Sequence, residues 1–203
     1  MFRAFWEVIS LVELKSEEVD ALRELGNIGV AHAATSLSTM LGRMVEMSVP
    51  NVLIVSFSEL HEHFGDQVVV GVVTALEDVE NGRTGYLYIS FPEAKKVAGL
   101  LIDDESLLDS TIMELGNILS SSFCNAIADM LGIMLIPSPP SLAEDASIAI
   151  VEVIAAQIAE KSENVIIFET ELKENENAVR IFITLVPDEK FLSYILKMLG
   201  MLG

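Results

Sequence analysis

The chain has one cysteine and no group of histidines and cysteines with the spacing of a zinc site. A single thiol cannot form an intramolecular disulfide, so the sequence favours a reducing compartment and excludes zinc-finger types of site. Cys124 stands beside Phe123 near the expected buried side of a helix, which favours a small core residue over a reactive thiol. We expect a cytoplasmic protein.

Long apolar runs are also missing, although 51% of the residues are hydrophobic and the mean hydropathy is +0.49. The longest stretch without a formal charge, residues 25–42, is interrupted by Asn27, His32 and several hydroxyl residues, whereas a membrane-spanning helix needs about 20 mostly apolar residues. The start of the chain is broken by Glu7 and Glu13 and lacks a signal-peptide cleavage site. A large buried core without stable membrane insertion is therefore expected.

Positive charge is scarce, because 12 Lys and Arg stand against 31 Asp and Glu, and the net charge is −19. Such a chain would repel the phosphates of DNA or RNA, so nucleic acid is excluded as a partner. A basic protein surface is more compatible with this charge.

The sequence repeats itself at an offset of ninety residues, where residues 20–42 align with residues 110–132. The identical residues in the first copy are Glu24, Leu25, Gly26, Asn27, Ile28, Met40, Leu41 and Gly42. The chain has no Gly-, Pro- or Ser-rich linker that would separate the copies. We therefore predict one domain over residues 1–203, made of pseudo-symmetric halves at about 15–105 and 106–203.

Each half shows the same series of elements after its repeated helix. Strands are expected at residues 51–56, 67–76 and 84–91 and again at 133–137, 164–172 and 178–186, with turns at Asn81-Gly82 and near residues 175–177. Helices at 92–102 and 187–199 close the halves, and a buried helix at 146–159 replaces a loop at 58–66. The predicted fold is α/β (α+β), internally duplicated, with a β-sheet packed against the two long repeated helices.

The repeated helices each carry a narrow polar stripe, since every residue advances about 100° around a helix. The first stripe consists of Asp20, Glu24, Asn27 and Ala31, and the second of Ser110, Glu114, Asn117 and Ser121. The opposite sides should face the core, through Leu22, Leu25, Gly29, Ala33, Ser36, Leu37 and Met40 in the first helix and Ile112, Leu115, Leu119, Phe123, Ile127 and Met130 in the second. The small residues Ala31 and Ser121 would let another surface approach closely.

The stripes cannot form a nucleophile and base, because asparagine has no useful basicity and neither stripe contains His, Cys or Lys. An asparagine amide can hold a water molecule, and a glutamate can pair with a Lys or Arg of a partner. Positioning of this kind suffices for phosphoryl transfer, where alignment and electrostatics supply most of the catalysis. Alternatively, Gly26 and Gly116 are helix-packing contacts and the neighbouring Asn residues are merely solvated.

The doubled pattern S/D-x-x-x-E-x-x-N resembles that of the CheC/CheX/FliY phosphatases of chemotaxis, and its two copies resemble CheC more than CheX. The resemblance implies an α/β monomer that dephosphorylates the aspartyl phosphate of a CheY-type response regulator. It implies that Asn27 and Asn117 direct the attacking water, that Glu24 and Glu114 pair with a regulator lysine, and that Mg²⁺ comes with the regulator. It also implies a second partner, the receptor deamidase CheD.

Two features depart from the family pattern. His32 and Ser122 stand five residues after the two asparagines, where CheC-like sequences would be expected to have another asparagine. Because His32 lies at about 80° on the wheel, between stripe and core, a helix-packing role is favoured over catalysis. Residues 1–14 place Phe2, Phe5, Trp6, Ile9 and Val12 at helical spacing, which indicates an amphipathic extension. Plain packing or partial disorder is favoured over docking to a partner or membrane surface.

Three other interpretations are weighed against the phosphatase. His61-Glu62-His63 invites a metal site, but the spacing favours a solvated loop. A non-catalytic adaptor could dock a response regulator, CheD or both through the same acidic faces. A small-molecule enzyme is disfavoured, because the sequence has neither a Gly-rich phosphate loop nor a nucleophile with an adjacent base.

Overall fold

The computed structural model describes residues 16–42, 44–48, 50–102, 104–158, 164–174 and 177–202. The expected amphipathic extension at residues 1–14 and most of the turn expected near 175–177 lie outside these residues.

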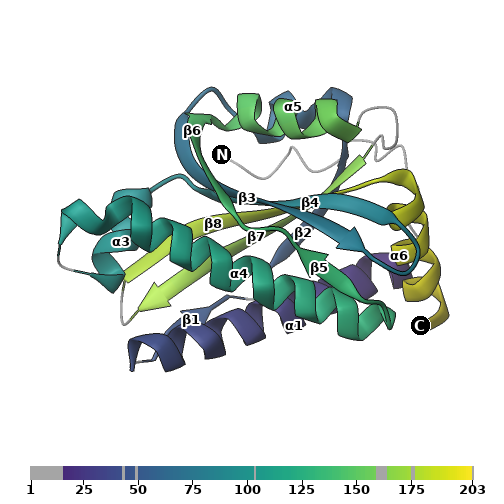
Figure 1. The fold of residues 1–203 in the computed structure, drawn as a ribbon, viewed down its shortest axis with the longest axis horizontal. Helices are drawn as coiled ribbons and strands as arrows, with labels where there is room; N and C mark the ends of the chain where they lie inside the picture. Colours follow the sequence, from purple (N-terminus) through teal and green to yellow (C-terminus); the bar gives the residue numbers. More distant parts are fainter. Residues whose placement is uncertain are drawn as a thin grey trace, which may run out of the picture.

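One antiparallel sheet of eight strands forms the centre of the described protein (Figure 1). The strands are β1 (Glu46–Met47), β2 (Asn51–Ser56), β3 (Val68–Asp78), β4 (Arg83–Phe91), β5 (Leu135–Pro137), β6 (Ser141–Ala146), β7 (Asn164–Glu174) and β8 (Asn177–Pro187). Their order is β1-β7-β8-β4-β3-β5, with β2 also paired to β7 and β6 also paired to β3. The expected α/β (α+β) class is confirmed.

The strand pairing joins the two halves of the chain. Strands β1 and β2 of the first half pair with β7 of the second, while β5 and β6 of the second half pair with β3 of the first. Strands β4 and β8 meet at the centre of the sheet. The Thr170 hydroxyl also donates to the Ser48 carbonyl at 2.7 Å. Each half therefore completes the sheet of the other.

Helices cover both faces of this sheet (Figure 1). On one face α1 (Ser16–Leu41) and α4 (Leu108–Leu131) lie side by side and run in opposite directions, with α3 (Ala94–Leu101) and α6 (Glu189–Leu202) at the two ends. On the other face lies α5 (Ser147–Ile158), near the short helix α2 (Leu60–His63). The two long helices thus pack on the sheet as the sequence predicts.

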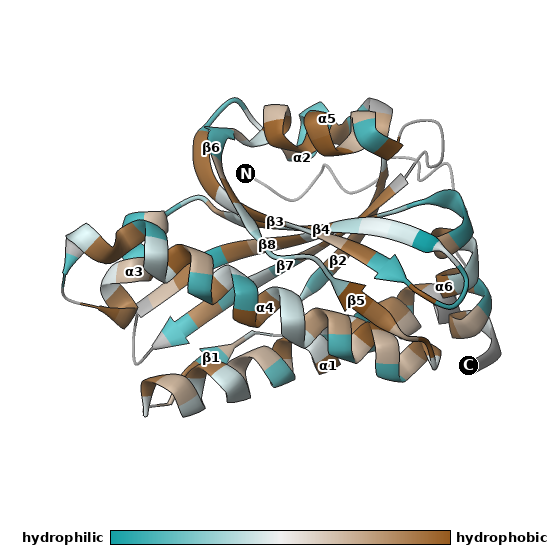
Figure 2. Ribbon diagram, viewed as in Figure 1, coloured by the Kyte–Doolittle hydropathy of each residue, from teal (hydrophilic) through white to brown (hydrophobic). Residues whose placement is uncertain are grey.

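The buried side chains form two apolar clusters, one on each face of the sheet. The larger cluster joins the sheet to α1 and α4, and its aromatic pair Phe123 and Phe168 has ring centroids 5.5 Å apart. The smaller cluster lies under α5, around the fully buried Tyr88. Figure 2 shows runs of hydrophobic residues along the strands, which fit a sheet covered on both faces.

Several elements differ from the sequence prediction. Where a loop was expected at 58–66, the chain forms a 3₁₀ turn (Phe57–Glu59) followed by α2. A capping box between Ser56 and Glu59 stabilises the start of the 3₁₀ turn. The strands β1 and β6 were not predicted. Near the end of α1, Ser36 and Met40 were expected in the core, but both are exposed, Met40 by 47%. The apolar stripe is therefore shorter than the helix.

The repeated glycines Gly26 and Gly116 are packing contacts between the long helices and the sheet. A Cβ on Gly26 would lie 2.8 Å from atoms of both Phe168 and Pro50, and a Cβ on Gly116 would lie 2.5 Å from Val72. Real Cβ atoms do not approach neighbours this closely. Packing therefore accounts for the glycines of the repeat, but not for the glutamate and asparagine beside them.

Replacing Gly116 with alanine should lower the free energy of unfolding by about 1–3 kcal/mol, because overpacking displaces α4 or Val72. Urea unfolding followed by circular dichroism measures the change. Gly99→Ala is the matched control: Gly99 is exposed in α3, and a Cβ added there would have no atom of another part of the chain within 4 Å. Alanine at this position should stabilise the helix by about 0.5–1 kcal/mol. Equal effects of the two substitutions would contradict the packing role.

Candidate functional site

The first polar stripe lies on the outer side of α1, away from the sheet. Asp20, Glu24 and Ala31 are exposed, whereas Leu22 and Leu25 on the opposite side of the helix are fully buried. The hydroxyl of Thr35 donates to the backbone carbonyl of Ala31 at 2.9 Å. This hydrogen bond is made to the helix backbone and uses no side chain of the stripe. The orientation predicted from the helical period is the one observed.

The second polar stripe occupies the equivalent surface of α4. Ser110, Glu114 and Asn117 are exposed and Ser121 is half-buried, while Ile112, Leu115 and Leu119 on the opposite side are fully buried. Since α1 and α4 pack side by side on the same face of the sheet (Figure 1), the two stripes lie on neighbouring, oppositely directed helices. A single partner could approach either stripe from the solvent side.

The two asparagines differ in their surroundings. Asn117 is exposed, but Asn27 is half-buried, and its Oδ1 atom is buried without a hydrogen-bond partner among the described residues. A buried carbonyl oxygen without a partner costs free energy, so Asn27 has an unsatisfied acceptor. The repeat therefore presents one open amide and one partly enclosed amide.

The two glutamates carry charges that the rest of the described chain does not neutralise. Among the described residues, neither Glu24 nor Glu114 has a Lys, Arg or His within ion-pairing distance. Asp20, by contrast, pairs with Arg23 at 3.4 Å on an exposed surface. Both glutamates thus remain available for a cation of a partner.

The structure corrects the prediction for His32. The wheel placed it at the boundary of stripe and core with a packing role, but the residue is exposed. The next side chain along the helix, Ala33, fills the core instead and is fully buried. The equivalent Ser122 of the second repeat is only 5% exposed. The two equivalent positions therefore differ in burial.

Two other candidates from the sequence contribute no reactive site. Cys124 is 1% exposed, and burial raises the pKa of its thiol to about 12, so the thiol stays protonated and unreactive. His61 and His63 are exposed on α2, and His61 Nε2 lies 3.3 Å from Glu152 Oε1. Within the part of the chain that the structure describes, no three His, Cys, Asp or Glu side chains converge to hold a metal ion.

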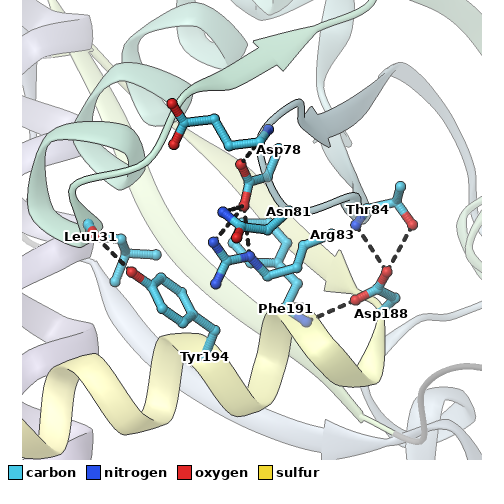
Figure 3. Close-up of polar contacts among 9 residues, drawn as sticks. Asp78, Asn81, Arg83, Thr84, Leu131, Asp188, Phe191 and Tyr194 are labelled. Atoms are coloured by element: carbon cyan, nitrogen blue, oxygen red, sulfur yellow. Dashed lines mark hydrogen bonds and ion pairs between the residues drawn. The ribbon is translucent and has the colours of Figure 1, made fainter.

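A buried polar cluster that was not predicted joins the β3–β4 turn to α6 (Figure 3). Arg83 donates through Nε to Asp78 Oδ2 at 2.6 Å and lies with its guanidinium 3.6 Å from the centre of the Tyr194 ring. Asn81 donates to the same carboxylate oxygen at 3.2 Å. The Tyr194 hydroxyl donates to the Leu131 carbonyl at the end of α4, at 3.1 Å. The cluster therefore fixes the turn, α6 and α4 to one another.

The charge of Asp78 is stabilised inside this cluster. Burial alone would raise the pKa of the carboxyl group, but its hydrogen bonds from Arg83, Asn81 and the Glu80 amide outweigh burial and hold the pKa below its usual value. The sequence contained a signal for this pair: Asp78 and Arg83 flank the predicted Asn81-Gly82 turn, and they are direct cross-strand neighbours in the hairpin. Their burial under α6 was not visible in the sequence.

No helix in the described ranges is long and apolar enough to cross a membrane.

Comparisons with known proteins agree with the motif positions. Residues 17–54 and 108–144, which hold most of both repeated helices, match the model of the CheC-like family. Over 189 residues the chain is 29% identical to the CheY-P phosphatase CheC of Bacillus subtilis, covering 86% of this chain and 90% of that protein. It is 28% identical over 126 residues to the flagellar motor switch phosphatase FliY of the same organism, covering 62% of this chain and 32% of that longer protein.

The fold is also similar to a solved structure. The crystal structure of Thermotoga maritima FliY matches with a TM-score of 0.69 and 21% sequence identity, over 93% of this chain and 98% of that one. At this identity the match shows the fold. The family model and the sequence relatives confirm the resemblance to CheC-type chemotaxis phosphatases that the doubled motif indicated.

Proposed function

We propose that this chain, similar to the CheC-like family along both repeated helices, is a phosphatase that hydrolyses the aspartyl phosphate of a CheY-type response regulator. The observation that carries the proposal is the pair of equivalent Glu and Asn residues on the outer surfaces of α1 and α4. Packing explains the glycines between them, and it explains neither the two glutamates nor the two asparagines. The names of the CheC and FliY relatives support the reaction class.

The chemistry assigned to the stripes is positioning. The amide of Asn27 or Asn117 holds a water molecule in line with the aspartyl phosphate of the regulator, and Glu24 or Glu114 pairs with a lysine beside it. The water oxygen attacks phosphorus while the bond from phosphorus to the carboxylate oxygen breaks. Inorganic phosphate and a free aspartate result, and the water proton leaves with phosphate or solvent, because asparagine cannot take it.

The regulator would supply the remaining parts of the site. Each stripe offers a single glutamate and an amide, with a further acid only at Asp20, which is too small a set of ligands for a resident Mg²⁺ ion. We therefore assign the Mg²⁺ to the regulator, where it would neutralise charge on the phosphoryl group. Binding of CheD is part of the same proposal, and co-purification of the two proteins tests it.

Catalysis and mere docking are separated by one experiment. The cognate regulator is phosphorylated, and the loss of its phosphate is followed with and without the chain at equal regulator concentration. A phosphatase shortens the lifetime of the phosphorylated regulator, whereas an adaptor binds it without changing that lifetime. An unchanged lifetime with saturating protein would refute the proposed activity and leave the adaptor.

Reversing the charge of one stripe should weaken regulator binding. Glu114→Lys should raise the Kd for the phosphorylated regulator by about tenfold, because a favourable ion pair becomes a repulsion at the contact. Asp129→Lys makes the same change of net charge at an exposed position near the other end of α4, and it should change the Kd by less than about twofold. Calorimetric titration measures both, and similar losses would place the regulator elsewhere.

A further inference from the structure

An open pocket of about 490 Å³ lies between the β3–β4 turn and α6. It is lined by Asn81, Arg83, Glu189, Lys190, Ser193, Tyr194 and Lys197. The polar cluster shown in Figure 3 forms one of its walls. The proposed phosphatase mechanism uses none of these side chains.

The pocket is lined by more cationic than anionic side chains, whereas the whole chain is strongly acidic. Among the described residues, four Lys and Arg side chains have no carboxylate within ion-pairing distance, and these are Lys95, Arg180, Lys190 and Lys197. Two of the four line this one pocket. In a chain with a net charge of −19, two unneutralised ammonium groups at one pocket mark it as a site for negative charge.

The spacing of the two lysines limits the size of the anion. Lys190 and Lys197 are seven residues apart on α6, so they lie on the same side of the helix and about 10 Å apart along its axis. Ser193 and Tyr194 lie between them and also line the pocket. A single phosphate is too short to contact both ammonium groups unless both side chains bend towards it. A longer anion can contact both in extended conformations.

The opposite wall is rigid. The Arg83 side chain is 9% exposed, and its Nε and Nη2 atoms are both held by Asp78. The Asp78 carboxylate is in turn occupied by Asn81 and by the amide of Glu80. This wall needs little reorganisation to receive a ligand, which lowers the cost of binding. Glu189 is the one lining residue that opposes an anion.

We propose that this pocket binds an anion with at least two linked phosphoryl groups. Lys190 and Lys197 contact the two ends of the anion, and Ser193 offers a hydroxyl donor between them. Because the Arg83 guanidinium already covers one face of the Tyr194 ring, the site has no pair of open aromatic faces for a base, and the phosphoryl groups supply the affinity. Pyrophosphate is the simplest probe of this class.

The test is calorimetric titration of the full chain with pyrophosphate at constant ionic strength. Pyrophosphate should bind with one-to-one stoichiometry and more tightly than orthophosphate. The variant Lys190→Gln/Lys197→Gln should weaken binding by at least about tenfold, since it removes both charge-assisted contacts. Lys95→Gln/Arg180→Gln removes the other two unneutralised cations and the same net charge, and it should weaken binding by less than about twofold.

The variant Glu189→Gln is a control for folding defects, because it is expected to gain affinity for pyrophosphate instead of losing it. Removal of this carboxylate from the pocket should tighten pyrophosphate binding, which a damaged protein would not do. The proposal is overturned if pyrophosphate shows no saturable binding up to about 5 mM, if both double variants lose equal affinity, or if orthophosphate binds as tightly as pyrophosphate. None of these measurements depends on phosphatase activity, so either proposal can fail without the other.

Discussion

Replacing both Asn27 and Asn117 with alanine is expected to slow dephosphorylation of the regulator by about a hundredfold, because the attacking water loses the group that aligns it. Regulator binding should change little, since Glu24 and Glu114 remain. This separation of rate from affinity distinguishes a water-positioning amide from a docking contact. Phosphate release from the phosphorylated regulator measures the rate, and titration with the regulator measures the affinity.

The single variants and a control complete this experiment. Asn117→Ala should cost more activity than Asn27→Ala, because Asn117 is exposed while Oδ1 of Asn27 is buried and turned away from solvent. Gln67→Ala removes another exposed amide, beside α5 on the opposite side of the sheet, and should leave the rate unchanged. A double variant with the wild-type rate would remove the asparagines from the mechanism.

The largest loss of stability is expected from Asp78→Asn. The substitution leaves the buried guanidinium of Arg83 without its counter-charge, and such changes cost about 3–5 kcal/mol of unfolding free energy. For a chain of this size that corresponds to a fall in Tm of roughly 6–20 °C. Asp20→Asn breaks the exposed pair with Arg23 instead, and should cost less than about 1 kcal/mol.

The stability lost in Asp78→Asn should depend on pH. The pKa of Asp78 is lowered in the folded protein, so its contribution to stability is complete above the unfolded-state value of about 3.9 and is lost as the pH falls through the lower folded-state pKa. The difference in Tm between wild type and Asp78→Asn should therefore be constant near neutral pH and shrink below about pH 4. A difference that grows on acidification would contradict the ion pair.

The main elements could be predicted because their signals are local. The β-rich run at residues 51–56 predicted the observed bounds of β2, and the period of the repeated helices correctly placed Glu24, Glu114 and Asn117 on the outer surface. Strand β1 has only two residues, and the six residues of β6 have no buried side chain and no apolar alternation. Neither strand therefore has a local pattern to detect, and both are placed by pairing with strands of the other half of the chain.

The sequence also did not predict the differences in burial between equivalent positions of the two repeated helices. The helical wheel gives Asn27 and Asn117 the same direction, yet Asn27 is half-buried and Asn117 is exposed. The wheel also placed His32 at the edge of the core, where the structure shows it exposed. The Asp78–Arg83 pair could have been found from the charges on either side of the predicted turn, but its burial depends on Tyr194, more than a hundred residues later.

The exchange of strands between the halves also determines when the protein can fold during synthesis. The partner of β1 and β2 is β7, and the contact between Ser48 and Thr170 spans 122 residues. While the ribosome is still making the second half, β1 and β2 therefore have no strand to pair with. Long-range pairing of this kind is slow and exposes strand edges. We expect the sheet to close only after β7 has left the exit tunnel, so the nascent first half would have the greatest need for chaperones.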